Sequence, residues 1–204
     1  EHADREPEQQ CWLAVKQYRS AEHRMFHRDA GYLEGRRVRR SREMRAMARR
    51  TEFGRELVSG QWAFAEFAAL TRLWELELSV PYPIQLDGRE MLMEFIGEGR
   101  VAAPRLAQAR PPEDLLPSLF EQLRSTLLAL CREGWAHGDL SPYNVLLRGE
   151  QLVFIDWPQI VDIVGNPQGF TFLERDVSTM CTWFNQRGYA VDAGELIAEA
   201  TGAW

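Results

Sequence analysis

The chain has 204 residues, of which 45% are hydrophobic, and a formal net charge of −6 at pH 7. This length and apolar content fit one folded domain, and the lack of both a signal peptide and a run of 18 apolar residues argues for a cytoplasmic protein with no membrane partner. The three cysteines, Cys11, Cys131 and Cys181, show no C-x-x-C spacing and no histidine cluster beside them, which argues against a disulfide framework and against zinc.

Residues 11–18 are predicted to form a short apolar strand that carries Lys16. This is the only lysine among 24 basic residues, the others being arginine. The sequence Leu-Ala-Val-Lys at 13–16 matches the V-A-I-K pattern of kinases, in which the ammonium holds the α- and β-phosphates of ATP. Lysine suits that position because it is a compact point charge, whereas arginine is a wide planar fork. The alternative is a surface lysine with no special role.

A basic segment follows at residues 19–60. It holds 12 arginines and 6 acidic residues, a net charge of +6, so the rest of the chain carries −12. The arginines are densest over Arg36–Arg50, and residues 36–58 are predicted to form a polar helix or pair of helices. One interpretation is a solvated arginine-rich helix. The other is contact with the phosphates of a nucleotide or of a nucleic acid.

The next predicted helix, residues 61–76, places Glu66 within an apolar stripe. Trp62, Ala69, Leu70 and Leu73 lie at helical spacings from it. A buried carboxylate without a cation is unfavourable, and Lys16 is the obvious candidate partner. The alternative is that Glu66 lies at the edge of the stripe and reaches water.

Two strands are predicted next, over 83–86 and 90–95, on either side of a turn at Asp87-Gly88. Residues 96–112 contain several glycines and prolines, which favours a connector between two lobes. A long helix is predicted over 113–133, with Gly134 as its C-cap.

The motif with the most chemical information begins at His137 and contains Asp139 and Asn144. Asp156 follows seventeen residues after Asp139. In kinases, an Asp of this loop meets the nucleophile, an Asn five residues later takes one Mg²⁺, and a later Asp takes the other. The spacing therefore favours a kinase over the alternative of a simple turn and strand end. His137 is expected to pack within the loop rather than act as a base.

The remaining predicted elements are a helix over 172–184, which ends before Gly188, and a helix over 192–200. Asp176 lies on the apolar face of the first helix. We expect it to accept hydrogen bonds from the backbone of the Asp139 loop rather than to act chemically.

These motifs together resemble the RIO-type atypical protein kinases over residues 12–184. The most specific matches are Ile-Asp-Trp-Pro-Gln at 155–159 and Glu-Arg-Asp-Val at 174–177. The resemblance implies an α+β, bilobal kinase-like fold without activation-loop and peptide-binding segments. The small lobe, residues 1–96, would contain a sheet and a helix with the basic insertion at about 19–60. The larger, mostly helical lobe would be residues 97–204.

The resemblance also implies the chemistry. It implies ATP with Mg²⁺ or Mn²⁺, serine autophosphorylation or an ATPase cycle, and a link to ribosome maturation, for which Arg36–Arg50 is the candidate contact with ribosomal RNA or a pre-ribosomal particle. It places the adenine against the carbonyl of Glu94 and the N–H of Ile96. The other expected roles are Lys16 on the phosphates, Glu66 orienting Lys16, Asn144 and Asp156 on the metal, and Asp139 at the acceptor hydroxyl.

Several expectations remain open. The resemblance implies a strand, a phosphate-covering loop and a second strand ahead of Lys16, but residues 1–10 contain no glycine, so the small lobe is expected to be incomplete here. Asp156 is an alternative acceptor of phosphate. Candidate autophosphorylation sites are Ser20, Ser41 and Ser59. Two competing functions are a small-molecule kinase of the aminoglycoside-phosphotransferase type and an ATP-regulated, ribosome-binding pseudokinase.

Overall fold

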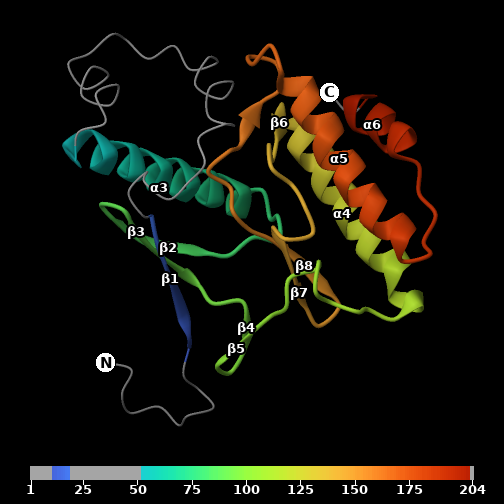
Figure 1. The fold of residues 1–204 in the computed structure, drawn as a ribbon, viewed down its shortest axis with the longest axis horizontal. Helices are drawn as coiled ribbons and strands as arrows, with labels where there is room; N and C mark the ends of the chain where they lie inside the picture. Colours follow the sequence, from blue (N-terminus) through green and yellow to red (C-terminus); the bar gives the residue numbers. More distant parts are fainter. Residues whose placement is uncertain (1–10, 19–51, 203–204) are drawn as a thin grey trace.

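A computed structural model describes residues 11–18 and 52–202, with the side chains of 52–58 left out of the description. Figure 1 shows a small sheet with one long helix beside it, and a second, larger part built from helices and short hairpins. No helix in these ranges is long and apolar enough to cross a membrane. The mixed helix and sheet agree with the expected α+β class.

The sheet has three antiparallel strands in the order β1-β3-β2. They are β1 (Leu13–Gln17), β2 (Pro83–Asp87) and β3 (Glu90–Glu94). Lys16 lies opposite Met91, which is fully buried. The predicted β2–β3 hairpin is confirmed, with Gly88 at a φ of 56° in its turn. Side chains alternate between the two faces of a strand, so Lys16 and Val15, which is 65% exposed, lie on opposite faces of β1.

Helix α3 runs from Glu52 to Glu75 without a break. The predicted division between a helix ending at 58 and another starting at 61 is therefore wrong. A single glycine in a helix interior costs only about 1 kcal/mol, and Gly60 is followed directly by an apolar stripe that fixes the helix against the sheet. That stripe includes Ala63, Leu70 and Leu73, all nearly inaccessible to solvent. The rest of the predicted basic helix, 36–51, lies outside the described residues.

The predicted connector contains a small hairpin that the sequence did not predict, β4 (Gly97–Glu98) with β5 (Val101–Ala102). Gly97 fits there because a Cβ atom at this position would lie 2.2 Å from the carbonyl oxygen of Val101. After the hairpin, the chain runs beside residues 145–148, where the N–H of Leu147 donates to the carbonyl of Pro104 at 2.9 Å.

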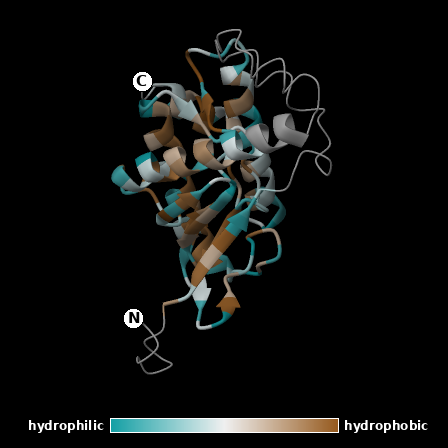
Figure 2. Cartoon of the chain, turned by 90° about the vertical axis from the view of Figure 1, so that its left-hand side faces the viewer, coloured by the Kyte–Doolittle hydropathy of each residue, from teal (hydrophilic) through white to brown (hydrophobic). Residues whose placement is uncertain are grey.

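The larger part contains the 3₁₀ turn η3 (Glu113–Leu115) and the helices α4 (Leu116–Arg132), α5 (Gly169–Gln186) and α6 (Ala193–Gly202). Its strands are β6 (Trp135–Ala136) paired with β9 (Val161–Asp162), and β7 (Val145–Arg148) paired with β8 (Gln151–Phe154). Figure 2 shows brown hydrophobic and teal hydrophilic residues mixed along the helices. The core joins α4 and α5 through residues such as Leu123, Leu127, Val177 and Phe184.

Cys131 and Cys181 are buried in this core, as expected, and Cys11 is exposed. Burial raises the pKa of both buried thiols to about 11. They therefore stay protonated at neutral pH and act as small apolar side chains.

Candidate active site

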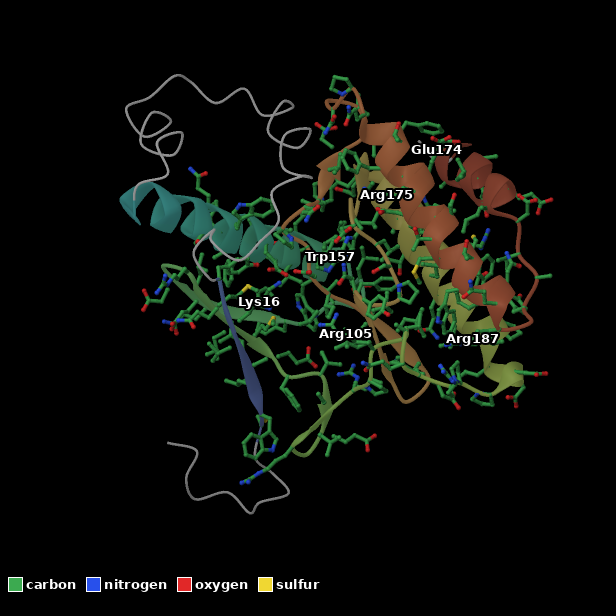
Figure 3. The ribbon with its side chains drawn as sticks, viewed as in Figure 1. Lys16, Arg105, Trp157, Glu174, Arg175 and Arg187 are labelled. Atoms are coloured by element: carbon green, nitrogen blue, oxygen red, sulfur yellow. The ribbon has the colours of Figure 1, made fainter. Side chains whose placement is uncertain are left out.

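The ammonium of Lys16 joins three parts of the chain that are distant in sequence. Its Nζ lies 2.7 Å and 2.6 Å from the two carboxylate oxygens of Glu66 on α3, and 2.7 Å from Oδ1 of Asp156 after β8. The predicted pairing of Glu66 with Lys16 is confirmed, and Asp156 joins it. Figure 3 places Lys16 where the sheet faces the helical part, with Trp157 nearby.

Glu66 is the buried member of this cluster, with a side chain only 2% exposed. The backbone N–H of Trp157 also donates to its Oε1, at 3.0 Å. Burial raises the pKa of the Glu66 carboxyl, and the ammonium of Lys16 opposes that rise. The carboxylate is therefore held in place from two sides, which fixes the direction in which Lys16 points.

Asp156 has a φ of 69°, in the left-handed region that few residues other than glycine adopt. Its side chain is 42% exposed, compared with 23% for Lys16. An unfavourable backbone conformation at an accessible carboxylate is typical of functional sites. It turns the chain sharply between Ile155 and Trp157.

His137 is fully buried, and its Nε2 lies 3.0 Å from the carbonyl oxygen of Ile155. A carbonyl only accepts hydrogen bonds, so Nε2 carries the proton and Nδ1 accepts from the N–H of Asp139 at 3.3 Å. Burial lowers the pKa of His137, which keeps the ring neutral. Its contacts support the expected packing role, since both ring nitrogens are engaged within the fold.

Asn144 links the two halves of the motif. Its side-chain Nδ2 donates to the backbone carbonyl of Asp139 at 2.8 Å, and the backbone carbonyl of Asn144 accepts from the N–H of Ile155 at 2.9 Å. The first contact fixes the loop, and the second places Asn144 beside the residue that precedes Asp156. Because the amide nitrogen is engaged, the side-chain oxygen is the atom left for a cation.

The loop is anchored from α5 by Asp176, as predicted. Its carboxylate accepts from the N–H groups of Gly138 at 2.7 Å and Leu140 at 2.9 Å, and the neighbouring Arg175 donates to the carbonyl of Gly138. Burial raises the pKa of Asp176 to about 7, against these hydrogen bonds. Asp139 lies between the two anchored N–H groups, so its backbone is fixed on both sides.

The connector also holds this loop, a contact that the sequence analysis missed. The N–H of Leu106 donates to the carbonyl of Val145 at 2.8 Å, and the N–H of Ala107 donates to that of Pro142 at 2.9 Å. The side chain of Arg105 donates to the carbonyl of Tyr143. Two of these three contacts are between backbone groups, which leave no signature in the residue types.

Glu94 and Ile96 lie where β3 meets the connector. The carboxylate of Glu94 pairs with Arg148 of β7 at 3.0 Å and accepts from the N–H of Tyr82 at 3.2 Å. The carbonyl of Ile96 accepts from the N–H of Ala103 at 3.0 Å. The Glu94 side chain therefore ties the sheet to the larger part, a role that the sequence analysis did not assign.

The structure thus brings Lys16, Glu66 and Asp156 into direct contact and places Asn144 and Asp139 next to them through backbone links. Within the described ranges, no group of three or more His, Cys, Asp or Glu side chains could hold a metal ion. An amide oxygen and one accessible carboxylate nevertheless fit Mg²⁺, which usually takes few protein ligands and completes its shell with substrate phosphates and water.

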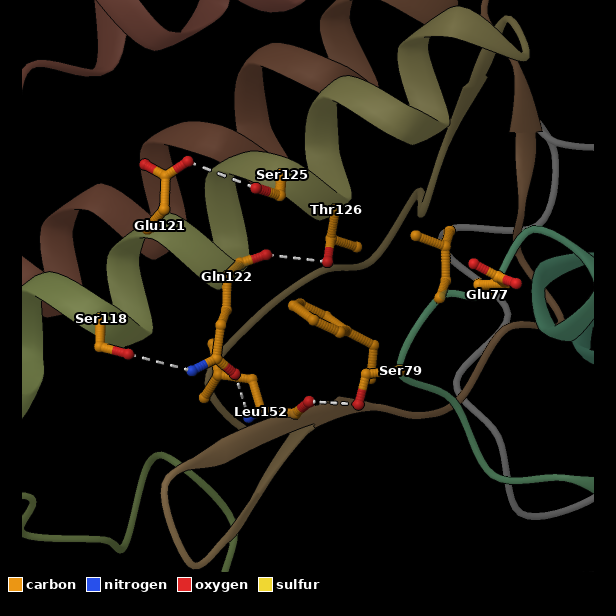
Figure 4. Close-up of a pocket in the computed structure, with 10 residues that line it drawn as sticks. Glu77, Ser79, Ser118, Glu121, Gln122, Ser125, Thr126 and Leu152 are labelled. Atoms are coloured by element: carbon orange, nitrogen blue, oxygen red, sulfur yellow. Dashed lines mark hydrogen bonds between the residues drawn. The ribbon is translucent and has the colours of Figure 1, made fainter.

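A separate cavity of about 490 Å³ lies between α4 and β8 and contains none of the predicted site residues (Figure 4). Its polar atoms bond to one another. Ser79 donates to the carbonyl of Leu152, Thr126 donates to that of Gln122, and the amide of Gln122 contacts Ser118. Because these groups are already satisfied, we do not assign the reaction to this cavity.

Comparison with known proteins points to one family. The sequence model of the RIO domain family matches residues 3–196. The RIO-type serine/threonine-protein kinase Rio1 of Haloferax volcanii is 33% identical over 141 residues, which are 69% of this chain and 48% of that protein. The chain therefore spans about half the length of this relative.

Two solved structures are similar in fold, both of the Rio2 kinase from Chaetomium thermophilum. One is an ADP/Mg²⁺-phosphoaspartate complex, with a TM-score of 0.65 and 25% identity over 83% of this chain and 52% of that one. The other has a TM-score of 0.68 and 23% identity over 93% of this chain and 55% of that one. The kinase-like fold is thus confirmed.

Proposed function

The chain belongs to the RIO kinase family, and we propose that it binds Mg-ATP between its sheet and its helical part and transfers the γ-phosphoryl group to a serine hydroxyl, of a protein substrate or of the chain itself. The observation that carries the proposal is the contact of Lys16 with both Glu66 and Asp156. It brings a phosphate-binding cation and a metal-binding carboxylate to one point. We assign residues 1–96 to the small lobe and 97–204 to the larger lobe.

In this proposal, Lys16 holds the phosphates of ATP and Glu66 keeps it pointing toward them. Glu66 is the suitable partner because it is buried and held by Trp157, whereas Asp156 is accessible and able to exchange Lys16 for another cation. The carbonyl of Glu94 and the N–H of Ile96 receive the adenine, at the junction of β3 and the connector.

Asn144 and Asp156 are the proposed ligands of Mg²⁺ or Mn²⁺. A bound divalent ion neutralises charge on the transferred phosphoryl group. The protein supports it by fixing both side chains: Asn144 through the carbonyl of Asp139, and Asp156 through the turn that begins at Ile155.

Asp139 is the proposed partner of the acceptor hydroxyl, which it orients and deprotonates. Its position depends on Asp176, which holds the N–H groups on either side. Of the candidate acceptors within the chain, Ser59 is only 4% exposed and its hydroxyl would not reach the site without local opening. Ser20 and Ser41 lie outside the described residues.

A second candidate is ATP hydrolysis through a phosphorylated Asp156. The exposure and left-handed backbone of this residue support it, because a phosphoryl donor can reach an accessible carboxylate. The similar Chaetomium structure is a phosphoaspartate complex. The γ-phosphorus–oxygen bond to ADP would break as the Asp156 oxygen bonds to phosphorus, and water would later release phosphate.

The proposed partner beyond ATP is a ribosomal RNA or pre-ribosomal particle, bound through Arg36–Arg50. This segment lies outside the described residues, so the proposal depends on its charge alone. A cytoplasmic location is proposed with it. The family match over residues 3–196 favours these assignments over a small-molecule kinase.

The test is labelling of the full chain with γ-³²P-ATP and Mg²⁺, beside magnesium-dependent ATP binding measured by calorimetry. We expect wild type to bind and become labelled, with acid-stable label on serine. Asp139→Asn should bind ATP but lose that label, whereas the exposed control Asp114→Asn should keep both. Label that hydroxylamine removes would indicate Asp156 instead. Absence of magnesium-dependent binding would contradict both functions, and binding without label or hydrolysis would favour an ATP-regulated pseudokinase.

A further inference from the structure

Two arginines meet at the C-terminal end of α5 without an acidic partner. Nη2 of Arg187 and Nη1 of Arg110 both donate to the carbonyl oxygen of Ala109, at 3.3 Å and 3.2 Å. Neither guanidinium forms an ion pair with any carboxylate in residues 11–18 and 59–202. Figure 3 places Arg187 far from Lys16, beyond Arg105. The pair is therefore outside the candidate active site.

Arg187 is held rigidly. Its guanidinium lies over the ring of Trp183, with its central carbon 4.5 Å from the ring centroid, and Trp183 is itself only 6% exposed. Its Nε is buried and has no hydrogen-bond partner in the described part of the chain. Burial and the nearby charge of Arg110 lower the pKa of Arg187, although a guanidinium keeps its proton in proteins. A fixed, partly desolvated cation thus lies beside a second one.

Some other arginines in the described structure have carboxylate partners. Arg72 pairs with Glu75 and Glu133, Arg124 with Glu121 and Glu199, and Arg148 with Glu94. Within the described residues, Arg89, Arg100, Arg105 and Arg132 form no ion pair either, so the lack of a carboxylate partner is not by itself unusual. Arg110 and Arg187 are distinguished by their proximity, because both guanidiniums donate to the same carbonyl oxygen with no carboxylate between them.

A purely structural role explains half of this arrangement. Arg187 is the C-cap residue of α5, where the partial negative charge of the helix end favours a cation, and its contact with Ala109 ties α5 to the connector. The same argument does not extend to Arg110. Arg110 is exposed, yet its guanidinium turns back to the carbonyl that Arg187 already uses.

We propose that Arg110 and Arg187 form a binding site for a phosphomonoester dianion, such as inorganic phosphate or a phosphorylated serine side chain. Two guanidiniums on one side of an anion offer paired N–H donors in the fork geometry that suits phosphate oxygens. A monoester carries close to two negative charges at neutral pH, which matches the two cations. A phosphodiester carries only one. This site goes beyond the proposed function because it involves none of the ATP-binding residues.

The site has a physical link to the loop of Asp139. Arg110 lies three residues after Ala107, which together with Arg105 bonds to the loop carbonyls of Pro142 and Tyr143. An anion that fixes Arg110 to Arg187 would restrain residues 105–110 at their far end.

The experiment is a titration of the ¹⁵N-labelled full chain, saturated with ADP and Mg²⁺ so that the nucleotide site is filled. The probes are inorganic phosphate, N-acetyl-phosphoserine amide and, as the singly charged probe, dimethyl phosphate. We expect the Nε–H signal of Arg187 and the backbone N–H of Arg110 to shift with both monoesters. Binding of dimethyl phosphate should be about tenfold weaker or undetectable, since one charge-assisted contact corresponds to roughly that factor.

Arg110→Gln and Arg187→Gln should each weaken phosphoserine binding about tenfold or more, whereas Arg132→Gln, an exposed arginine at the end of α4, should not change it. Arg110→Gln removes an exposed side chain and should fold normally even if Arg187→Gln does not. Unchanged signals, equal binding by Arg110→Gln, or equal affinity for dimethyl phosphate would each overturn the proposal. Binding of phosphate without phosphoserine would restrict the site to the free ion. None of these results depends on phosphoryl transfer.

Discussion

Lys16 balances two carboxylates, so its removal affects stability as well as activity. In Lys16→Met, the 2% exposed carboxylate of Glu66 loses its cation. We expect the free energy of unfolding to fall by roughly 2–3 kcal/mol, below the range for a fully buried pair because Lys16 is itself 23% exposed. Phosphoryl transfer should fall by at least about 100-fold. Urea unfolding and γ-³²P-ATP labelling measure the two effects.

The control is the double variant Lys16→Met/Glu66→Gln. Removing the charge of Glu66 should restore part of the stability lost in Lys16→Met, giving a coupling energy above about 1 kcal/mol in the double-mutant cycle. Activity should stay low. If the loss in the double variant equals the sum of the losses in Lys16→Met and Glu66→Gln, the observed ion pair contributes nothing to folding.

Asp176 makes stability depend on pH. Its pKa is about 7 in the folded protein and 3.8 in its ordinary state, so the folded chain holds this proton more tightly. The stabilisation that the bound Asp176 proton gives the folded state is fully present below about pH 4, decreases as the pH rises, and is lost above about pH 7. Asp176→Asn does not titrate. The stability of wild type relative to Asp176→Asn should therefore fall by about 2 kcal/mol between pH 5 and pH 8 in urea unfolding. A constant or rising difference would contradict the assigned pKa.

For individual residues, the sequence predicted which side chains form the site, but it did not predict all of their contacts. Glu66 was recognisable because a carboxylate in an apolar stripe needs a cation, and the chain has one lysine. The contact of Lys16 with Asp156 could not be predicted in the same way, because it depends on how two segments 140 residues apart are packed. The contact of Arg187 with the Ala109 carbonyl likewise depends on tertiary structure alone.

Among the elements, the loop after β6 has little room for an added side-chain atom. Gly138 has a φ of 83°, and a Cβ atom there would lie 2.3 Å from the carbonyl oxygen of Gln159. We expect Gly138→Ala to destabilise the protein by more than about 2 kcal/mol, because a backbone clash adds to the usual left-handed penalty of about 1–2 kcal/mol. The loop carrying Asp139 should shift and transfer should be lost. Thermal unfolding and labelling provide the measurements.

Gly88→Ala is the matched control for this loop. Gly88 also has a positive φ, 56°, but a Cβ atom added there would meet no other atom within 4 Å, because the residue lies at the tip of the β2–β3 turn. The Gly88→Ala variant should lose about 1 kcal/mol of unfolding free energy, from the left-handed backbone alone, and should keep its activity. Equal losses in both variants would mean that backbone conformation, not the clash with Gln159, determines the effect.

Element boundaries followed the sequence where apolar periodicity was strong. The predicted strand at 11–18 and hairpin at 83–95 are present, as are the helices at 113–133, 172–184 and 192–200, with ends shifted by a few residues. The division of α3 at 59–60 was wrong because packing outweighs a single glycine. The β4–β5 hairpin was missed because its strands have two residues each, too few to show alternation.

For the molecule as a whole, the kinase-like fold could be predicted because its motifs are local and widely spaced along one chain. Their relative placement could not, apart from the contacts of Glu66 with Lys16 and of Asp176 with the Asp139 loop. It arises from backbone contacts between the connector and the Asp139 loop, and from the Glu94–Arg148 pair between β3 and β7. These contacts set how the sheet faces the helices, and hence whether a nucleotide could bridge Lys16 and Asn144.

This arrangement predicts that Mg-ATP stabilises the whole molecule rather than one part. The proposed ligands come from β1, from the loop before β7 and from the turn after β8, so a nucleotide that contacts all three binds only the folded chain. At about 100 times its Kd, such a ligand adds about 2.7 kcal/mol to the free energy of unfolding. We therefore expect a single thermal transition that moves upward with Mg-ATP and returns when EDTA removes the metal.

Asn144→Ala separates the metal from the nucleotide in this measurement. The variant loses the amide oxygen and also the Nδ2 contact with the carbonyl of Asp139. Without ligand, its free energy of unfolding should therefore be lower by about 1 kcal/mol, the usual value of one hydrogen bond, and its thermal transition should begin at a lower temperature. The further shift produced by adding Mg²⁺ to ATP should largely disappear, while the smaller shift with ATP and EDTA should remain, since Lys16 is intact. A full magnesium-dependent shift in Asn144→Ala would show that the metal is held without this side chain, and Asp156 would then have to bind it with other ligands.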